Sequence, residues 1–82
     1  MNMLSIKEKL LQKVMQTVYV GPDQIQETTL LFKEGYFDSM GFIMLLSFID
    51  EEFGVKVNDE ELLEENFESI SAISDFISRK LN

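Results

Sequence analysis

The chain has 82 residues and contains no cysteine, no histidine and no tryptophan, with a single proline. Without cysteine, neither a disulfide framework nor a thiolate zinc site can form, so the fold must rest on apolar packing. Without histidine, a Ser-His-Asp catalytic relay is excluded. A chain of this length can hold one domain, and we expect residues 1–82 to form it. So small a core leaves little room for a deep enzyme pocket.

Basic residues are scarce as well. Seven lysines and arginines face fifteen acidic residues, which gives a net charge of −8. Such a field repels nucleic acid and anionic lipid and attracts basic protein surfaces, although solubility alone explains it equally well. No apolar run approaches the roughly 20 residues needed to cross a bilayer, and Lys7, Glu8 and Lys9 interrupt any signal-peptide core. We therefore expect a soluble, cytoplasmic monomer that inserts into no membrane.

Hydrophobic periodicity predicts a first helix from about residue 5 to 20, followed by a long loop. Ser5 and Glu8 have the spacing of a capping box, and Gly21-Pro22 supplies a stop. The apolar residues of this helix recur every four residues: Ile6, Leu10, Val14 and Val18. From 23 to 38 the periodicity lapses, and the scattered apolar residues predict a loop pinned to the core by its own side chains: Ile25, Leu30, Leu31 and Phe32. A loop this long is uncommon unless it is functional.

A second amphipathic helix is predicted over 39–53, with Gly54 as its stop. Its core-facing residues fall within an arc of about 100°: Phe42, Leu45, Leu46, Ile49 and Phe53. The opposite face is apolar near Ser39 and acidic further along, and comprises Met40, Gly41, Met44, Ser47, Phe48 and Glu51. Because methionine and phenylalanine on an exposed face are typical of contact surfaces, we expect partners to bind there.

The remainder of the chain predicts two more helices and no strand. Asn58 and Glu61 can cap a short helix over 59–65 that carries Leu62 and Leu63 toward the core. The last helix, over 69–81, has Arg79 and Lys80 in its final turn, where the helix dipole favours cations. Its apolar residues are Ile70, Ile73, Phe76, Ile77 and Leu81. The predicted fold is all-α: a four-helix bundle of three long helices and one short helix, with the long loop between the first two.

No residue pattern predicts catalysis or metal binding. The acidic runs at 50–52 and 59–61 lack the alternating oxygen ligands and central glycine of a calcium-binding loop, and no glycine-rich phosphate loop is present. Runs of this kind usually form solvated helix surface. We therefore expect no catalytic residue and no metal ligand in this chain.

Ser39 follows Asp38 where the loop turns into the second helix. A serine at a helix start is usually an N-cap, which contributes about 1 kcal/mol. Here Asp38 can provide the cap instead, which leaves the Ser39 hydroxyl free at the positive end of the helix dipole. That position suits an attached phosphodiester.

The sequence from Leu31 to Met40, Leu-Phe-Lys-Glu-Gly-Tyr-Phe-Asp-Ser-Met, resembles the acyl carrier protein family. So do Asp-Glu-Glu-Phe-Gly-Val at 50–55 and Asn-Phe-Glu-Ser-Ile at 66–70, so the resemblance spans essentially the whole chain. It implies that a phosphopantetheinyl transferase moves 4'-phosphopantetheine from coenzyme A onto Ser39, within a motif that includes Asp38. The thiol of this arm would carry acyl groups as thioesters, and the absence of cysteine would then be explained.

The resemblance also implies partners that load and process acyl groups, such as a ligase, a ketosynthase or a transferase, and that recognise the helix starting at Ser39. Carriers of fatty acid synthesis often have acidic residues two and five positions after the serine, where this chain has Gly41 and Met44. We therefore expect an apolar recognition face around Met40, Met44 and Phe48, and a dedicated lipid or secondary-metabolite pathway.

Two alternatives stay open from the sequence. Met40 after the serine and Phe37 before Asp38 also resemble carriers that load D-alanine or other amino acids. Alternatively, the chain is an unmodified helical interaction module in which Ser39 is only an N-cap, and Ser39→Ala would be tolerated. The sequence also leaves open whether the bundle shelters an acyl chain among Leu46, Ile49, Phe53, Ile70 and Ile73, or whether Phe42, Phe53, Phe67 and Phe76 fill that space.

Overall fold

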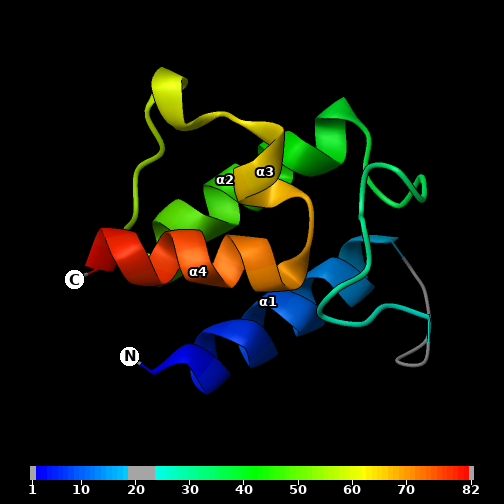
Figure 1. Cartoon of the computed structure of the whole chain (residues 1–82), viewed down its shortest axis with the longest axis horizontal. Coiled ribbons are helices and arrows are strands. Elements are labelled where there is room, and N and C mark those ends of the chain that lie inside the picture. The colour runs from blue at the N-terminus through cyan, green and yellow to red at the C-terminus, as the bar shows by residue number, and fades with distance from the viewer. Residues whose placement is uncertain (1, 19–23, 82) are drawn as a thin grey trace.

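The computed structural model of the chain describes residues 2–18 and 24–81, and within these ranges every regular element is helical (Figure 1). Four α-helices and one 3₁₀ turn follow one another along the chain: α1 Met3–Val18, α2 Ser39–Phe53, η1 Asp59–Glu61, α3 Glu64–Phe67 and α4 Ile70–Leu81. The predicted all-α, four-helix class, with a long loop before the second helix, is confirmed.

Helix α1 packs against α4 and runs in the opposite direction (Figure 1). Ile6, Leu10 and Val14, three members of the predicted apolar repeat, are buried. The helix starts earlier than the predicted Ser5, because the Asn2 side-chain oxygen accepts a hydrogen bond from the Ser5 backbone N–H at 2.8 Å. Asn2 therefore caps the helix in place of Ser5. The predicted stop at Gly21-Pro22 lies outside the described residues.

The loop over 24–38 is fastened to the rest of the molecule, as predicted. Ile25 and Leu31 are buried in the core. The Leu31 backbone N–H donates to the Glu68 carbonyl at 2.8 Å, and the Leu31 carbonyl accepts from the N–H groups of Tyr36 and Phe37 at 2.9 and 3.1 Å. These bonds fix the path of the chain into α2.

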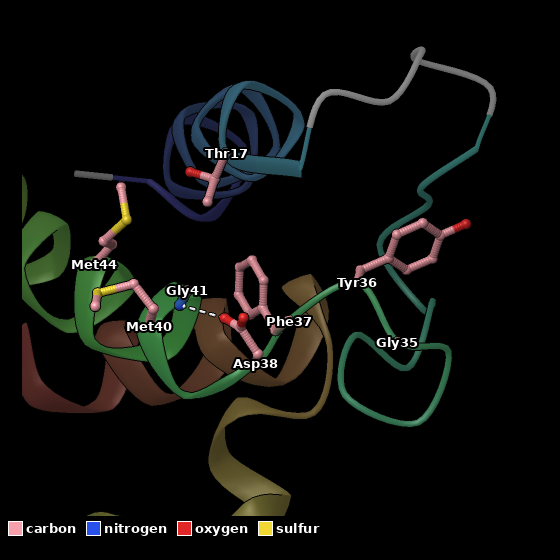
Figure 2. Close-up of a pocket in the computed structure, with 8 residues that line it drawn as sticks. All are labelled: Thr17, Gly35, Tyr36, Phe37, Asp38, Met40, Gly41 and Met44. Carbon is pink, nitrogen blue, oxygen red and sulfur yellow. Dashed lines mark hydrogen bonds between the residues drawn. The ribbon is translucent and has the colours of Figure 1, made fainter.

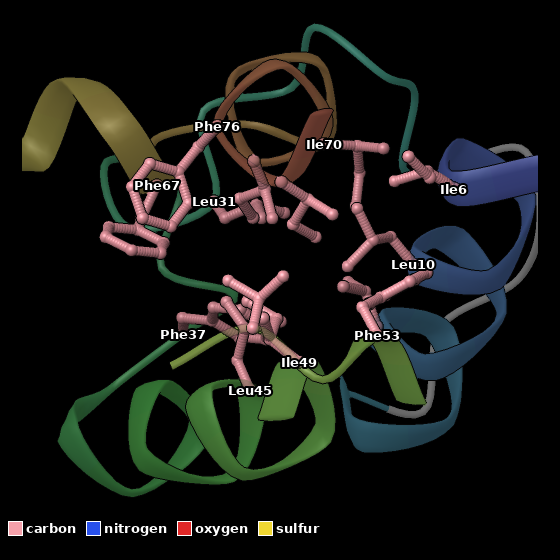
Figure 3. Packing of buried hydrophobic residues seen from close by; sticks show 14 of the residues in the cluster. Ile6, Leu10, Leu31, Phe37, Leu45, Ile49, Phe53, Phe67, Ile70 and Phe76 are labelled. Atoms are coloured by element: carbon pink, nitrogen blue, oxygen red, sulfur yellow. The ribbon is translucent and has the colours of Figure 1, made fainter. Parts of the chain in front are cut away.

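Helix α2 has the predicted bounds. Gly54 adopts a left-handed conformation with φ of 69°, which glycine tolerates without steric cost, and its N–H closes the helix onto the Asp50 carbonyl at 2.9 Å. Leu45, Ile49 and Phe53 are buried (Figure 3). Phe42 and Leu46 are half-buried and pack against the core.

The predicted short helix over 59–65 is broken in two, and the prediction that Leu62 and Leu63 face the core is wrong. Both side chains are exposed, by 43% and 49%, and Phe67 takes the core position instead. The 3₁₀ turn ends at Glu61, and Leu63 has extended backbone angles before α3 begins. The Glu61 carboxylate accepts the Asn58 backbone N–H at 2.9 Å, as the predicted capping box requires.

Helix α4 buries Ile70, Ile73, Phe76 and Ile77, whereas Leu81, which was predicted to face the core, is 44% exposed at the last turn. Two cations near the end of α4 bind the segment before it: Lys80 pairs with Glu61 at 3.0 Å and Arg79 donates to the Asn66 side-chain oxygen at 3.2 Å.

Candidate functional site

The site is built around Ser39, the first residue of α2. Asp38 precedes it with extended backbone angles, and the Asp38 Oδ1 atom accepts the Gly41 backbone N–H at 2.9 Å (Figure 2). Asp38 is therefore the N-cap. Ser39 is exposed, and among the described residues nothing forms a hydrogen bond with its hydroxyl. The hydroxyl is consequently free to react.

The start of α2 also presents unpaired donors. The Gly41 N–H is taken by the Asp38 carboxylate and the Phe42 N–H by the Asp38 carbonyl at 3.0 Å. Within residues 2–18 and 24–81, no acceptor pairs with the N–H of Ser39 or Met40. A helix of 15 residues has its positive dipole end at this point, which favours an anionic group on the serine.

Gly41, which the sequence placed on the exposed partner face, is buried beneath Phe37. A Cβ added at this glycine would lie 3.3 Å from Phe37 Cδ1 and 3.5 Å from Asp38 Oδ1. The Phe37 ring itself is only 7% exposed. A glycine here lets the phenylalanine and the capping aspartate close over the first turn of α2.

Phe48 also differs from its predicted place on that face. It is half-buried between α1 and α2, with its ring 5.9 Å from the Phe53 ring in an edge arrangement. The Lys13 ammonium lies over the Phe48 ring, 5.6 Å from its centroid. The side chain is therefore only partly exposed and contacts residues of both α1 and α2.

The face that α2 does expose contains a residue that sequence reasoning missed, Ile43, which is 57% exposed. It lies between Met40 and Met44, exposed by 64% and 43%. We call the exposed stripe of α2 the outer stripe: Met40, Ile43, Met44, Ser47 and Glu51. The spacing i, i+3, i+4, i+7 starting from Met40 would have found it.

A groove of about 350 Å³ lies between the start of α2 and the last turns of α1 (Figure 2). Its lining mixes polar and apolar groups: Thr17, Gly35, Tyr36, Phe37, Asp38, Met40, Gly41 and Met44. The residues on both sides of Ser39 in the sequence line it, while Ser39 does not. We call it the α1 groove.

The part of the chain that the structure describes offers neither a metal centre nor a membrane-spanning helix. It holds no group of three or more side chains that could bind a metal ion. None of its helices is long and apolar enough to span a membrane.

Residues 8–77 match the family model described as the phosphopantetheine attachment site. The chain is also 30% identical over 81 residues to an acyl carrier protein of Thermosynechococcus vestitus, an alignment that covers 99% of this chain and 98% of the relative. The chain belongs to the acyl carrier protein family. As a member, this carrier is not an enzyme, and it works through a covalently attached 4'-phosphopantetheine. Family membership also implies interaction with a modifying transferase and with acyl-processing enzymes.

The fold of this carrier is found in a solved structure as well. A chain in a crystal structure of an FAD-dependent dehydrogenase superposes with a TM-score of 0.72 and 28% identity. The match covers 79% of the carrier and 92% of that chain. The matched chain is therefore about as small as this one.

Proposed function

We propose that the 4'-phosphopantetheine of this carrier is attached to the Ser39 Oγ atom. The observation that carries the proposal is that two adjacent residues, Asp38 and Ser39, have different roles at the start of α2. Asp38 takes the capping bond to Gly41 at 2.9 Å, and the exposed Ser39 hydroxyl makes no hydrogen bond within the described ranges. The unpaired N–H groups of Ser39 and Met40 fit a phosphodiester at this point.

The attachment is a phosphoryl transfer. The Ser39 oxygen forms a bond to the phosphorus that bears the pantetheine arm, the pyrophosphate bond of coenzyme A breaks, and adenosine 3',5'-bisphosphate leaves. The proton of the hydroxyl passes to a base of the transferase, because this chain has no histidine and no other base is bonded to Ser39 within the described ranges. Once bound, the arm supplies the thiol that carries an acyl group as a thioester.

The test is the intact mass of the purified apo-protein before and after incubation with coenzyme A, magnesium and a broad-specificity phosphopantetheinyl transferase. We expect a gain of one phosphopantetheinyl group in the wild type and in Ser47→Ala, an exposed serine on the same helix. Ser39→Ala should remain unmodified while keeping its helical circular dichroism. A modified Ser39→Ala variant would place the arm elsewhere, and a folded, unmodified wild type that several transferases leave unchanged would favour the interaction module.

The outer stripe is the proposed recognition face. Its first two turns are apolar and its end is acidic, so a partner needs an apolar socket near Met40, Ile43 and Met44 and basic residues near Glu51. This chemistry favours a dedicated pathway. Met44→Glu should weaken binding to the carrier's own loading ligase, ketosynthase or transferase, whereas Leu4→Glu, at an even more exposed apolar site on α1, should not. Improved binding or turnover by Met44→Glu would contradict the assignment.

The packing of Phe37 weakens the alternative that the cargo is an amino acid. Its ring covers Gly41 and is almost entirely buried, so packing explains this residue without reference to cargo. Only Met40 then remains as a residue that favours an amino acid. We therefore propose an acyl cargo, and competition between aminoacyl and acyl loading by the natural ligase is the measurement that decides it.

An FAD-dependent dehydrogenase is a candidate among the acyl-processing partners, because a chain of the same fold and 28% identity occurs in a structure of such an enzyme. The proposed step removes two hydrogen atoms from the tethered acyl group and reduces FAD to FADH₂. The result that supports it is loss of the visible flavin absorbance when the acyl-loaded carrier is mixed anaerobically with the dehydrogenase. Equal bleaching by the unloaded carrier would contradict it.

A further inference from the structure

The outer stripe carries the most exposed methionine side chains of the described residues. Met40 is 64% exposed and Met44 is 43% exposed. The other methionines that the structure describes, Met3 and Met15, are half-buried on α1. The two exposed thioethers come from successive turns of α2, and both line the α1 groove (Figure 2). The exposed thioethers of the described ranges are therefore gathered on one face, next to the proposed attachment point.

A thioether is the group on this face that a peroxide oxidises. The chain has no cysteine, so no thiol of the polypeptide competes for the oxidant. The sulfur attacks hydrogen peroxide: an S–O bond forms, the O–O bond breaks, and the second oxygen leaves as water after taking up the proton of the transferred oxygen. Sulfur is oxidised and the peroxide is reduced. The product is methionine sulfoxide, which is polar and which methionine sulfoxide reductases return to the thioether.

Oxidation changes the chemistry of the outer stripe at its apolar end. Met40, Ile43 and Met44 are the exposed apolar residues that the socket of a partner would cover. A sulfoxide oxygen is a hydrogen-bond acceptor that water solvates, and covering it with an apolar surface costs free energy because no donor replaces the water. Of these three residues, only Ile43 keeps its apolar side chain. Oxidation therefore removes apolar contact surface from the stripe without changing the net charge.

An enzyme that reaches Ser39 has to cover Met40. The two residues are adjacent in the first turn of α2, and both are exposed. Met44 follows Met40 by four residues and lies on the same side of the helix. A transferase that places the phosphorus of coenzyme A against the Ser39 Oγ atom therefore contacts the outer stripe at its first turns, whereas Met3 and Met15 belong to a different helix.

We propose that Met40 and Met44 form a reversible oxidation site that controls partner binding. With both side chains as thioethers, the outer stripe binds partner enzymes. With both as sulfoxides, it binds them weakly until a reductase restores the thioethers. The oxidant is hydrogen peroxide or another hydroperoxide. The inference rests on the proposed function, in which the arm is attached to Ser39 and the outer stripe is the recognition face.

The experiment treats the apo-protein with hydrogen peroxide, removes the oxidant, and maps each methionine by peptide mass spectrometry. We expect Met40 and Met44 to be oxidised before Met3 and Met15. The oxidised protein is then incubated with coenzyme A, magnesium and the broad-specificity transferase. Its kcat/KM for modification should fall about tenfold, and methionine sulfoxide reductases A and B should restore it. Equal oxidation of all the described methionines, or an unchanged kcat/KM once Met40 and Met44 are oxidised, would overturn the proposal.

Two double variants assign the effect to the outer stripe. Met3→Leu/Met15→Leu keeps both exposed thioethers, so peroxide should still lower its kcat/KM about tenfold. Met40→Leu/Met44→Leu has no thioether on the stripe, so its kcat/KM, whatever its starting value, should be the same before and after peroxide. An equal loss in this variant would refute the assignment. Circular dichroism of each oxidised protein checks that the helices are retained.

Failure of the proposed function is distinguishable from failure of this inference. If the arm is not attached to Ser39, the unoxidised wild type gains no phosphopantetheinyl group on that residue. If the outer stripe is not the recognition face, Met44→Glu binds partners as tightly as the wild type does. Failure of the inference alone leaves both of those results as expected, and kcat/KM does not respond to oxidation.

Discussion

Phe37 and Gly41 are in contact across the first turn of α2, with a position for Cβ on the glycine only 3.3 Å from the phenylalanine ring. Phe37 thereby reaches the core while its neighbour Asp38 stays in capping position. Because of this contact, positions 41 and 44, where carriers of fatty acid synthesis often have acidic residues, differ in burial. Gly41 is buried under the ring, whereas Met44 is 43% exposed.

Glutamate should therefore destabilise the protein at position 41 but have little effect on stability at position 44. Gly41→Glu has to displace the Phe37 ring and disturb the Asp38 cap, and we expect it to lower the free energy of unfolding by about 1–3 kcal/mol. Met44→Glu places the carboxylate in solvent and should stay within about 0.5 kcal/mol of the wild type. Urea unfolding of the apo-proteins measures both. Equal losses in the two variants would mean that the ring contact does not constrain residue 41.

Removing the cap should destabilise α2 without touching the serine. Asp38→Ala eliminates the acceptor for the Gly41 N–H, bonded at 2.9 Å, and should lower the free energy of unfolding by about 1 kcal/mol. For a domain of this size that corresponds to a fall in the melting temperature of about 4–8 °C. Asp38→Asn keeps a capping oxygen and should melt close to the wild type. If the two variants melt alike, charge and not the hydrogen bond is what matters at this position.

Ser74 offers a stabilising change. Its side chain is fully buried in α4, and its hydroxyl has no hydrogen-bond partner within residues 2–18 and 24–81. Ser74→Ala removes this unpaired group and raises helix propensity, so the free energy of unfolding should increase by about 1 kcal/mol. Ser78→Ala, at a half-exposed position of the same helix, should gain only the smaller propensity term. Denaturant unfolding that ranks Ser78→Ala at or above Ser74→Ala would contradict this reading.

The parts of the fold that the sequence predicted well are those governed by local signals. Asp38 and Gly54 bound α2 because a cap and a left-handed glycine act within one turn. The predicted start of α1 is wrong because two residues three positions apart, Asn2 and Ser5, can each cap a helix. The Asn2 side chain accepts the Ser5 backbone N–H, so Asn2 is the cap.

The site was predictable only in part for a different reason. Helix α2 is apolar on most of its surface, so periodicity alone could not decide that Phe48 turns toward α1 while Ile43 faces solvent. Leu62 and Leu63 looked like core residues, but the segment around them is too short for its period to specify an orientation. Both leucines instead line a groove beside α2, and no residue pattern predicts that position.

The stability of the fold should depend on pH through the ion pair between Glu61 of η1 and Lys80 of α4. The pKa of Glu61 is lowered by the hydrogen bond from the Asn58 backbone and by Lys80, whose ammonium is 3.0 Å from the carboxylate. A group whose folded pKa is depressed stabilises the fold above its unfolded pKa, and the contribution is lost as the pH falls through the folded pKa. Glu61→Gln should therefore melt below the wild type at pH 7, and the difference should shrink as the pH falls below the ordinary range of a glutamate. Glu60→Gln, the exposed neighbour, is the control for the change in net charge. A difference between wild type and Glu61→Gln that is constant from pH 7 to about pH 3 would show that the bonds to Asn58 and Lys80 do not depend on ionisation.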